Sequence, residues 1–201
     1  MNPVSRVISR ANLSRALARN QLALEQAIVT ASSAKASFRS AGDRNLVDLI
    51  SVCQYFQFLN FDLSCLMRDL LTKRRRWHRV MHARHLALHA HECIEDSPKI
   101  LGKPLSALLH RIGAERGHQE SARELLQELR PMRKKHAREI RRIRHLAAAH
   151  RESNADSFVA VIDSIDPESA LELSRDLMAW LSNVLSFLTS VMATTEARHD
   201  A

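Results

Sequence analysis

Large apolar side chains recur every three or four residues along most of this chain, the spacing that is typical of amphipathic helices. Short polar breaks divide the pattern into five long stretches, at about residues 3–38, 46–71, 77–96, 121–150 and 167–195. The first stretch has the weakest apolar face, so it is predicted either to pack in a bundle or to extend from it as an arm. The second is apolar nearly all round, which is typical of a helix that is buried on every side.

Residues with capping chemistry stand where two of these stretches begin. Asp43 directly precedes the second stretch, and an aspartate there can accept hydrogen bonds from the free N–H groups of the first helical turn. Asp166 and Pro167 open the last stretch, and proline is favoured at the first position of a helix because its missing N–H is not needed there. Both helix starts are therefore predicted from local chemistry as well as from periodicity.

The remaining boundaries are set by breakers and by one capping box. Ser97 and Pro98 are expected to end the third helix, with residues 104–111 forming a short additional helical turn. Ser121, followed by Glu124, is the predicted start of the fourth helix. Taken together, the pattern predicts a single all-α domain over residues 1–201, an up-and-down bundle of about five long helices.

Composition supports this fold class and narrows the range of functions. Only 4 glycines and 5 prolines occur in 201 residues, which argues against sandwiches and barrels built from many tight turns. No glycine lies in a dinucleotide-binding or P-loop motif. The 3 cysteines form no C-x-x-C pair, so no disulfide framework is expected and a cytoplasmic location fits best. The longest uncharged stretch, 177–195, is apolar on one face, which favours packing over a membrane span.

The charge is strongly basic and is carried mainly by arginine. The chain has 30 Lys and Arg against 22 Asp and Glu, a net charge of +8, and 24 of the 30 cations are arginines. A guanidinium group can hold a phosphate with two parallel hydrogen bonds, whereas an ammonium group acts as a point charge. The charge therefore indicates a polyanionic partner, or cations that only solvate long helices.

Histidines form a stripe on the third predicted helix. At 100° per residue the stripe spans an arc of about 60°, and its members are His78, His82, His85 and His89. Two histidines one turn apart can bind a metal ion, but a polar hydrogen-bonded face needs none. The third predicted helix has no Glu-x-x-His motif of the kind that di-iron bundles use. We therefore expect neither a metal nor any other cofactor and keep a metal-binding bundle as the least favoured alternative.

The fourth predicted helix carries a dense basic run that continues beyond its end. RNA phosphates could neutralise this charge, and so could acidic residues of a neighbouring helix. The residues expected to contact RNA are Arg133, Lys134, Arg138, Arg141, Arg142 and Arg151.

The basic run contains a motif of known type, R-H-x-x-x-A-H-R-E, from Arg144 to Glu152. It resembles the arginine, polar residue, four residues, histidine signature of the HEPN superfamily, and the predicted all-α bundle matches that family's architecture. The resemblance implies a metal-independent endoribonuclease of toxin or defence type that works as a homodimer, with an antitoxin or other acidic protein as a further partner. It gives Arg144 the role of phosphate stabiliser, His150 that of general acid or base, and His145 a supporting polar position.

Two functions other than a HEPN-like endoribonuclease remain open. Many members of the superfamily bind RNA or nucleotides without cleaving them, so the motif alone does not require catalysis. The main alternative is a non-catalytic interaction module that uses the basic face, and the second is the metal-binding bundle.

Overall fold

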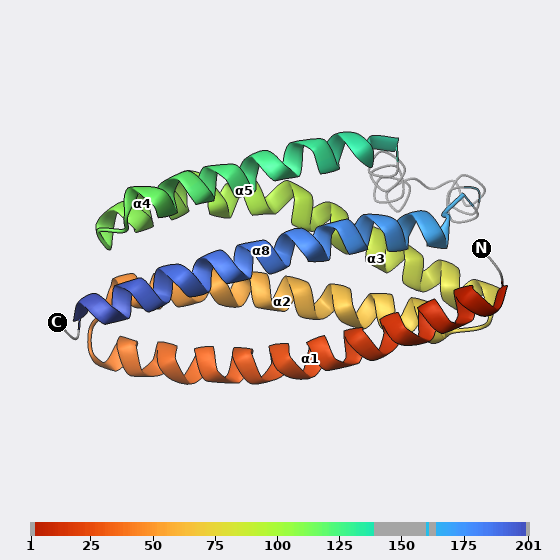
Figure 1. Ribbon diagram of the computed structural model, residues 1–201, viewed down its shortest axis with the longest axis horizontal. Coiled ribbons are helices and arrows are strands. Elements are labelled where there is room, and N and C mark those ends of the chain that lie inside the picture. The colour runs from red at the N-terminus through yellow and green to blue at the C-terminus, as the bar shows by residue number, and fades with distance from the viewer. Residues whose placement is uncertain (1–2, 139–159, 161–163, 200–201) are drawn as a thin grey trace, which may run out of the picture.

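Helices make up the regular secondary structure of residues 3–138, 160 and 164–199, the part of the chain that the computed structural model describes. Within these residues five helices are long: α1 (Pro3–Ser40), α2 (Arg44–Thr72), α3 (Arg76–Leu101), α5 (Arg116–Lys135) and α8 (Pro167–His199). The short α4 (Lys103–Arg111) follows α3. Successive long helices alternate in direction along the bundle (Figure 1), so the prediction of an all-α up-and-down bundle is confirmed.

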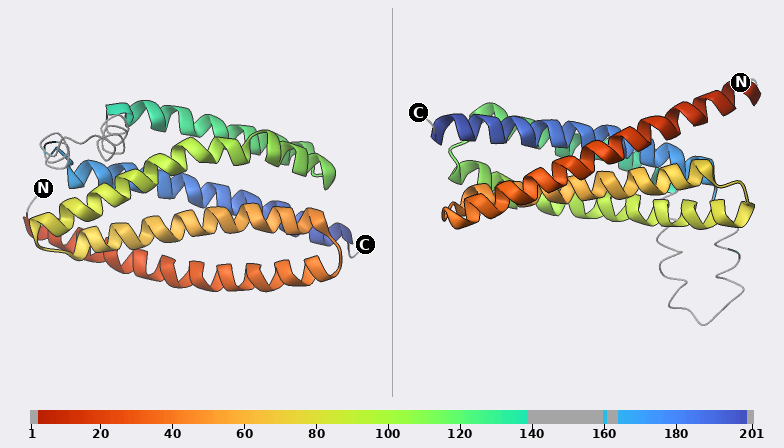
Figure 2. Two further views of the ribbon diagram at one scale, coloured as in Figure 1. Left: turned by 180° about the vertical axis from the view of Figure 1, so that it is seen from behind. Right: turned by 90° about the horizontal axis from the view of Figure 1, so that it is seen from below.

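Three helices form the middle of the bundle and two form its edges. α2, α3 and α8 pack against one another, α1 packs along α2, and α5 packs on α8 and α3 (Figure 2). Because α1, α3 and α8 cover only part of the surface of α2, one side of that helix meets solvent, where Phe58 is 51% exposed. The expectation that α2 is buried on every side is wrong at this position.

Within the core, Trp180 of α8 contacts both α2 and α5. Phe56 is fully buried and meets the edge of the Trp180 ring, with ring centroids 6.1 Å apart. The indole N–H of Trp180 donates to the carbonyl of Leu125, 2.9 Å away, which satisfies the one polar group of this buried side chain. Trp180 therefore ties three helices together by packing and by a hydrogen bond.

The contact between α1 and α2 includes several polar pairs, which explains the weak apolar face of the first predicted helix. Asn20 donates to Asn60 at 3.2 Å and to Ser64 at 2.8 Å, and both acceptors are buried. Nearer the end of α2, Arg68 donates to the side-chain oxygen of Gln21 at 2.9 Å. Such pairs fix the register of two helices, because a slip would leave buried polar groups without partners.

Both predicted caps are present. The Asp43 carboxylate accepts from the backbone N–H of Leu46 at 3.0 Å. The Asp166 carboxylate accepts from the backbone N–H groups of Glu168 and Ser169, each at 3.2 Å. Pro167 is the first residue of α8, as the sequence predicts.

The predicted end of the third helix is wrong, since α3 continues through Pro98. Ser97 and Leu101 on either side of the proline are buried, so packing in the core favours another helical turn. The helix ends at Gly102, whose backbone N–H donates to the Pro98 carbonyl at 3.0 Å. A Cβ atom at position 102 would lie 2.6 Å from that carbonyl oxygen, so glycine is the residue that fits this ending.

The predicted bounds of the fourth helix are also wrong. α5 begins at Arg116 rather than at Ser121, and an ion pair between Arg116 and Glu120 at 3.0 Å supports the added turn. The helix ends well before the predicted position, where the N–H of His136 donates to the Met132 carbonyl at 3.0 Å. Residues 139–159 lie outside the described part of the chain.

Among the described residues, α8 holds the one stretch that is long and apolar enough to be a candidate membrane span. From Pro167 to Thr195 its length and composition are those of a helix that can cross a membrane, a test that core helices also pass. Its apolar face packs against α2, α3 and α5. The apolar face that the sequence spacing predicts for this helix therefore contacts other helices of the bundle.

Candidate nucleic-acid interface

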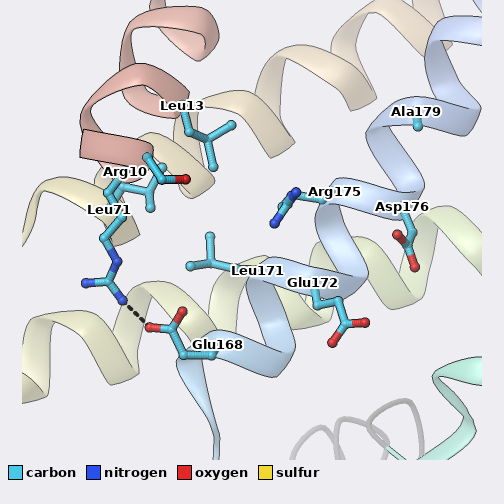
Figure 3. Close-up of a pocket in the computed structure, with 10 residues that line it drawn as sticks. Arg10, Leu13, Leu71, Glu168, Leu171, Glu172, Arg175, Asp176 and Ala179 are labelled. Carbon is cyan, nitrogen blue, oxygen red and sulfur yellow. Dashed lines mark hydrogen bonds and ion pairs between the residues drawn. The ribbon is translucent and has the colours of Figure 1, made fainter. Parts of the chain in front are cut away.

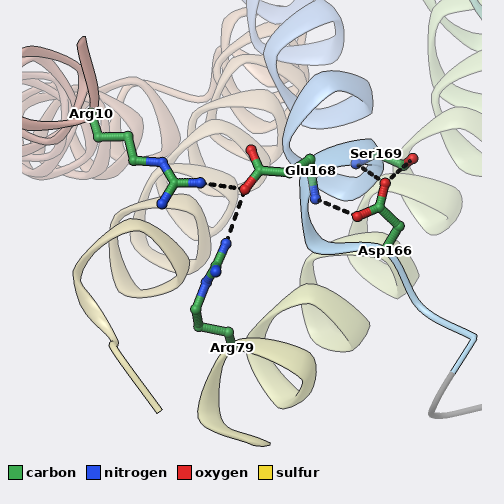
Figure 4. Close-up of polar contacts among 5 residues, drawn as sticks. All are labelled: Arg10, Arg79, Asp166, Glu168 and Ser169. Atoms are coloured by element: carbon green, nitrogen blue, oxygen red, sulfur yellow. Dashed lines mark hydrogen bonds and ion pairs between the residues drawn. The ribbon is translucent and has the colours of Figure 1, made fainter. Parts of the chain in front are cut away.

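One end of the bundle gathers cations from several helices. The start of α1, the link between α2 and α3, the end of α5 and the start of α8 lie together there (Figure 1). Glu168 at the start of α8 pairs with Arg10 of α1 and, at 3.0 Å, with Arg79 of α3 (Figure 4). One carboxylate is thus shared by two guanidinium groups, and we call this region the basic end.

One predicted RNA-binding cation, Arg133, and its neighbour in the basic run, Lys135, are neutralised within the bundle. Arg133 of α5 contacts Glu95 of α3 at 2.6 Å. Lys135 contacts Glu172 at 3.0 Å and Asp176 at 2.8 Å, both on α8. These pairs join α5 to its two neighbours, so acidic residues of adjacent helices account for part of the basic run.

Two other predicted cations face solvent. Lys134 and Arg138 are exposed and make no ion pair within the described residues. The other predicted RNA-binding residues, Arg141, Arg142 and Arg151, lie outside the described residues, as do the three predicted catalytic residues Arg144, His145 and His150. Of the predicted site, the structure therefore describes only the residues that precede the motif, at the end of α5 and just beyond it.

A buried histidine closes the end of α5. Nε2 of His136 lies 2.8 Å from a carboxylate oxygen of Asp176, and His136 is 8% exposed. Burial alone would raise the pKa of Asp176, but the hydrogen bonds from Lys135 and His136 outweigh it and lower that pKa. The carboxylate thus holds two successive residues of α5 against α8.

We expect the variant Asp176→Asn to lose about 1 kcal/mol of unfolding free energy at pH 7, a value reduced for solvent screening. Because the pKa of Asp176 is lower in the folded protein than in the unfolded chain, its contribution is present at neutral pH and is lost as the pH falls below 3.8. Urea denaturation followed by circular dichroism between pH 7 and pH 3 measures this difference. Glu120→Gln, which breaks an exposed pair on α5, is the control and should leave stability unchanged. A deficit in Asp176→Asn that stays constant with pH would contradict the assignment.

A groove of about 880 Å³ runs between the first part of α1 and the first part of α8. Leu13, Leu71 and Leu171 provide apolar walls, and Arg175 extends from α8 into the groove (Figure 3). Asp176 points away from it, consistent with its contact to α5. The groove opens at the basic end but mixes charges of both signs, so it is a weaker match to a polyanion than the exposed cations of α5.

The histidine stripe is divided between two environments. His82 lies 4.0 Å from Asp69 and His89 lies 3.6 Å from Asp62, both carboxylates being on α2, whereas His78 and His85 are exposed. Burial lowers the pKa of His82 although Asp69 acts in the opposite direction. In the described residues no group of three or more His, Cys, Asp and Glu side chains is placed to hold a metal ion. The stripe therefore serves in part as a contact between α3 and α2.

The cysteines are free thiols rather than reactive centres. Burial raises the pKa of Cys53 to about 11 and that of Cys93 to about 12, which keeps both protonated at neutral pH. Cys65 is half-buried, and burial raises its pKa too.

Three residues that organise the basic end were not predicted from the sequence. The sequence contains no local motif for Glu168, Asp176 and His136, because their partners are on other helices. The available signal was the i, i+4 spacing of Glu168, Glu172 and Asp176, which places three carboxylates on one face of the last predicted helix. That spacing gives an acidic stripe but does not identify the helix that it faces.

Comparison of the chain with protein-family models, with curated proteins and with solved structures gives no match.

Proposed function

We propose that this protein binds RNA at the basic end and cleaves it without a metal ion, in the manner that the resemblance to the HEPN superfamily implies. The observation that carries the proposal is a pair of exposed cations directly ahead of the motif in the chain, Lys134 in the last turn of α5 and Arg138 just beyond the helix. The cations of α1 and α3 at the same end extend the positive surface. Phosphate contacts by such residues supply most of the affinity of sequence-independent RNA binding.

The proposed chemistry needs only the side chains of the motif. A base such as the His150 imidazole removes the proton of a ribose 2′-hydroxyl, whose oxygen attacks the adjacent phosphorus. The 5′-oxygen of the next nucleotide leaves as its bond to phosphorus breaks and takes up a proton, which gives a 2′,3′-cyclic phosphate. Arg144 stabilises the charge that develops on the phosphate oxygens, and His145 supports this arrangement. A homodimer would bring two such motifs together.

The double variant Lys134→Ala with Arg138→Ala is expected to weaken RNA binding about tenfold at low salt. The slope of log affinity against log salt concentration should also fall by about 1 to 2, because two fewer phosphate contacts release fewer counterions. Fluorescence anisotropy of a labelled RNA at several salt concentrations measures both quantities.

The control removes the same number of positive charges from the other end of α5. Arg116 and Arg123 are exposed on the first half of α5, away from the basic end, so Arg116→Ala with Arg123→Ala should leave the slope close to that of the unaltered protein. An equal loss in both double variants would contradict the location of the interface. Absence of RNA binding even at low salt would contradict the proposed function itself.

A non-catalytic interaction module is the second candidate, and one observation favours it. Arg133 and Lys135 already pair with carboxylates of α3 and α8, which shows that acidic side chains fit the basic face. An acidic protein such as an antitoxin would bind the neighbouring exposed cations, Lys134 and Arg138. Stoichiometric binding of an acidic peptide in competition with RNA would support shared use of this face.

A further inference from the structure

The link between α2 and α3 forms a second basic surface, separate from α5. It consists of Lys73, Arg74, Arg75 and Arg76, all exposed, with Trp77 following in the first turn of α3. In the described residues Lys73, Arg74 and Arg75 make no ion pair. Three successive cations that make no ion pair in the described residues, Lys73, Arg74 and Arg75, repel one another, and an anion that binds them would relieve the repulsion.

Three arginines of this region line one hollow. Arg74, Arg76 and Arg79 line an open hollow of about 250 Å³ together with Ile165 and Pro167 near the start of α8. Arg79 shares the Glu168 carboxylate with Arg10 (Figure 4), and Arg74 makes no ion pair in the described residues, so positive charge remains at the hollow. A concave site with several guanidinium groups matches a phosphate, because each group can donate two parallel hydrogen bonds.

An exposed aromatic ring lies beside the hollow. Trp77 is 57% exposed, although tryptophan is usually among the more buried residues. The guanidinium of Arg76 lies over its ring, 5.3 Å from the centroid, and Arg76 also lines the hollow. One residue thus connects a phosphate-sized hollow to a ring on which a base can stack. Stacking on tryptophan is available to every base but needs a base that is not enclosed in a duplex.

The shape of the hollow favours a strand of nucleotides over a flat surface, because a strand can place a single phosphate in a concave site. An anionic membrane would meet Glu168 beside the hollow and would not enter a concave site, so it fits this geometry less well.

We propose that this surface binds single-stranded RNA, with a phosphate in the hollow formed by Arg74, Arg76 and Arg79 and the adjacent base stacked on Trp77. The inference rests on the proposed function, since it extends the RNA path from α5 across the start of α8 to the link between α2 and α3. It adds a preference that the α5 cations alone do not give. RNA with unpaired bases should bind better than duplex RNA of equal charge.

The test uses the fluorescence of Trp77 in the full-length protein. Titration with a uridine oligonucleotide should quench the emission of the exposed tryptophan, whereas polyphosphate, which has no bases, should bind with little quenching. Trp77→Phe leaves only the buried Trp180 and should abolish the quenching. Trp77→Ala should weaken binding of the single strand roughly 5- to 100-fold and leave duplex binding nearly unchanged.

Each outcome separates this inference from the proposed function. RNA binding that depends on Lys134 and Arg138 but neither quenches Trp77 nor responds to Trp77→Ala would overturn the inference and leave the function standing. Equal quenching by polyphosphate would overturn the stacked base. A blue shift of Trp77 emission with vesicles of anionic phospholipid, but not with RNA, would assign the surface to a membrane and overturn the inference. Failure of the unaltered protein to bind any RNA would overturn both proposals.

Discussion

His150→Ala is expected to slow RNA cleavage by about 10²- to 10⁴-fold, the usual contribution of a general acid or base, while RNA binding stays nearly unchanged. The imidazole transfers a proton in the transition state and adds little to the electrostatic attraction of phosphate. Arg144→Ala should reduce both cleavage and binding, because its guanidinium contacts phosphate in the ground state and the transition state. The two variants therefore separate catalysis from recognition.

The measurement is incubation of purified protein with single-stranded and structured RNA in EDTA, followed by mapping of the cut ends. His110→Ala is a suitable control because this exposed histidine lies on α4, at the opposite end of the bundle. Cleavage that persists unchanged in His150→Ala would show that the motif is not the catalytic centre. Cleavage that disappears only because EDTA is present would instead indicate a metal-dependent enzyme.

The spacing of the motif limits how Arg144 and His150 can approach each other. Six residues correspond to about 240° around a regular helix, so Arg144 and His150 would not share a face of one continuous helix. They can converge at a helix end, through the reach of the arginine, or across a dimer. α5 itself ends at Lys135, before the motif, so the arrangement of the two residues, like the homodimer, stays a prediction.

The fold was predictable because apolar periodicity and capping chemistry are local properties. Asp43 and Asp166 act as caps through atoms within three residues of themselves, and both were identified from sequence. The errors arose where tertiary packing decided the outcome. Pro98 lies within α3 because the residues around it are buried, which no local rule for proline includes.

The candidate site was less predictable for a related reason. The sequence shows that Arg133, Lys134 and Lys135 are basic, but not that two of them face carboxylates on α3 and α8 while the third faces solvent. That distinction depends on which helices are neighbours. The hollow between the α2–α3 link and the start of α8 joins residues about ninety positions apart, and sequence spacing carries no information on such a contact.

Trp180→Ala should have the largest effect on stability, a loss of about 3–5 kcal/mol in the free energy of unfolding. The indole is 3% exposed, packs against Phe56 and donates to the Leu125 carbonyl. Its removal leaves a cavity among α2, α5 and α8 and deletes the hydrogen bond between the indole and the Leu125 carbonyl. Such a loss is a large share of the 5–15 kcal/mol that is typical of a domain.

The second tryptophan provides a matched comparison for this prediction. Trp77 is 57% exposed, so Trp77→Ala should change the free energy of unfolding by less than about 0.5 kcal/mol. Urea denaturation of both variants, followed by circular dichroism, gives the two values directly. Equal losses would contradict the packing of α8 described above. We expect Trp77→Ala to keep its stability and to lose affinity for single-stranded RNA. The two variants then show that Trp180 stabilises the bundle, whereas Trp77 binds RNA at the basic end.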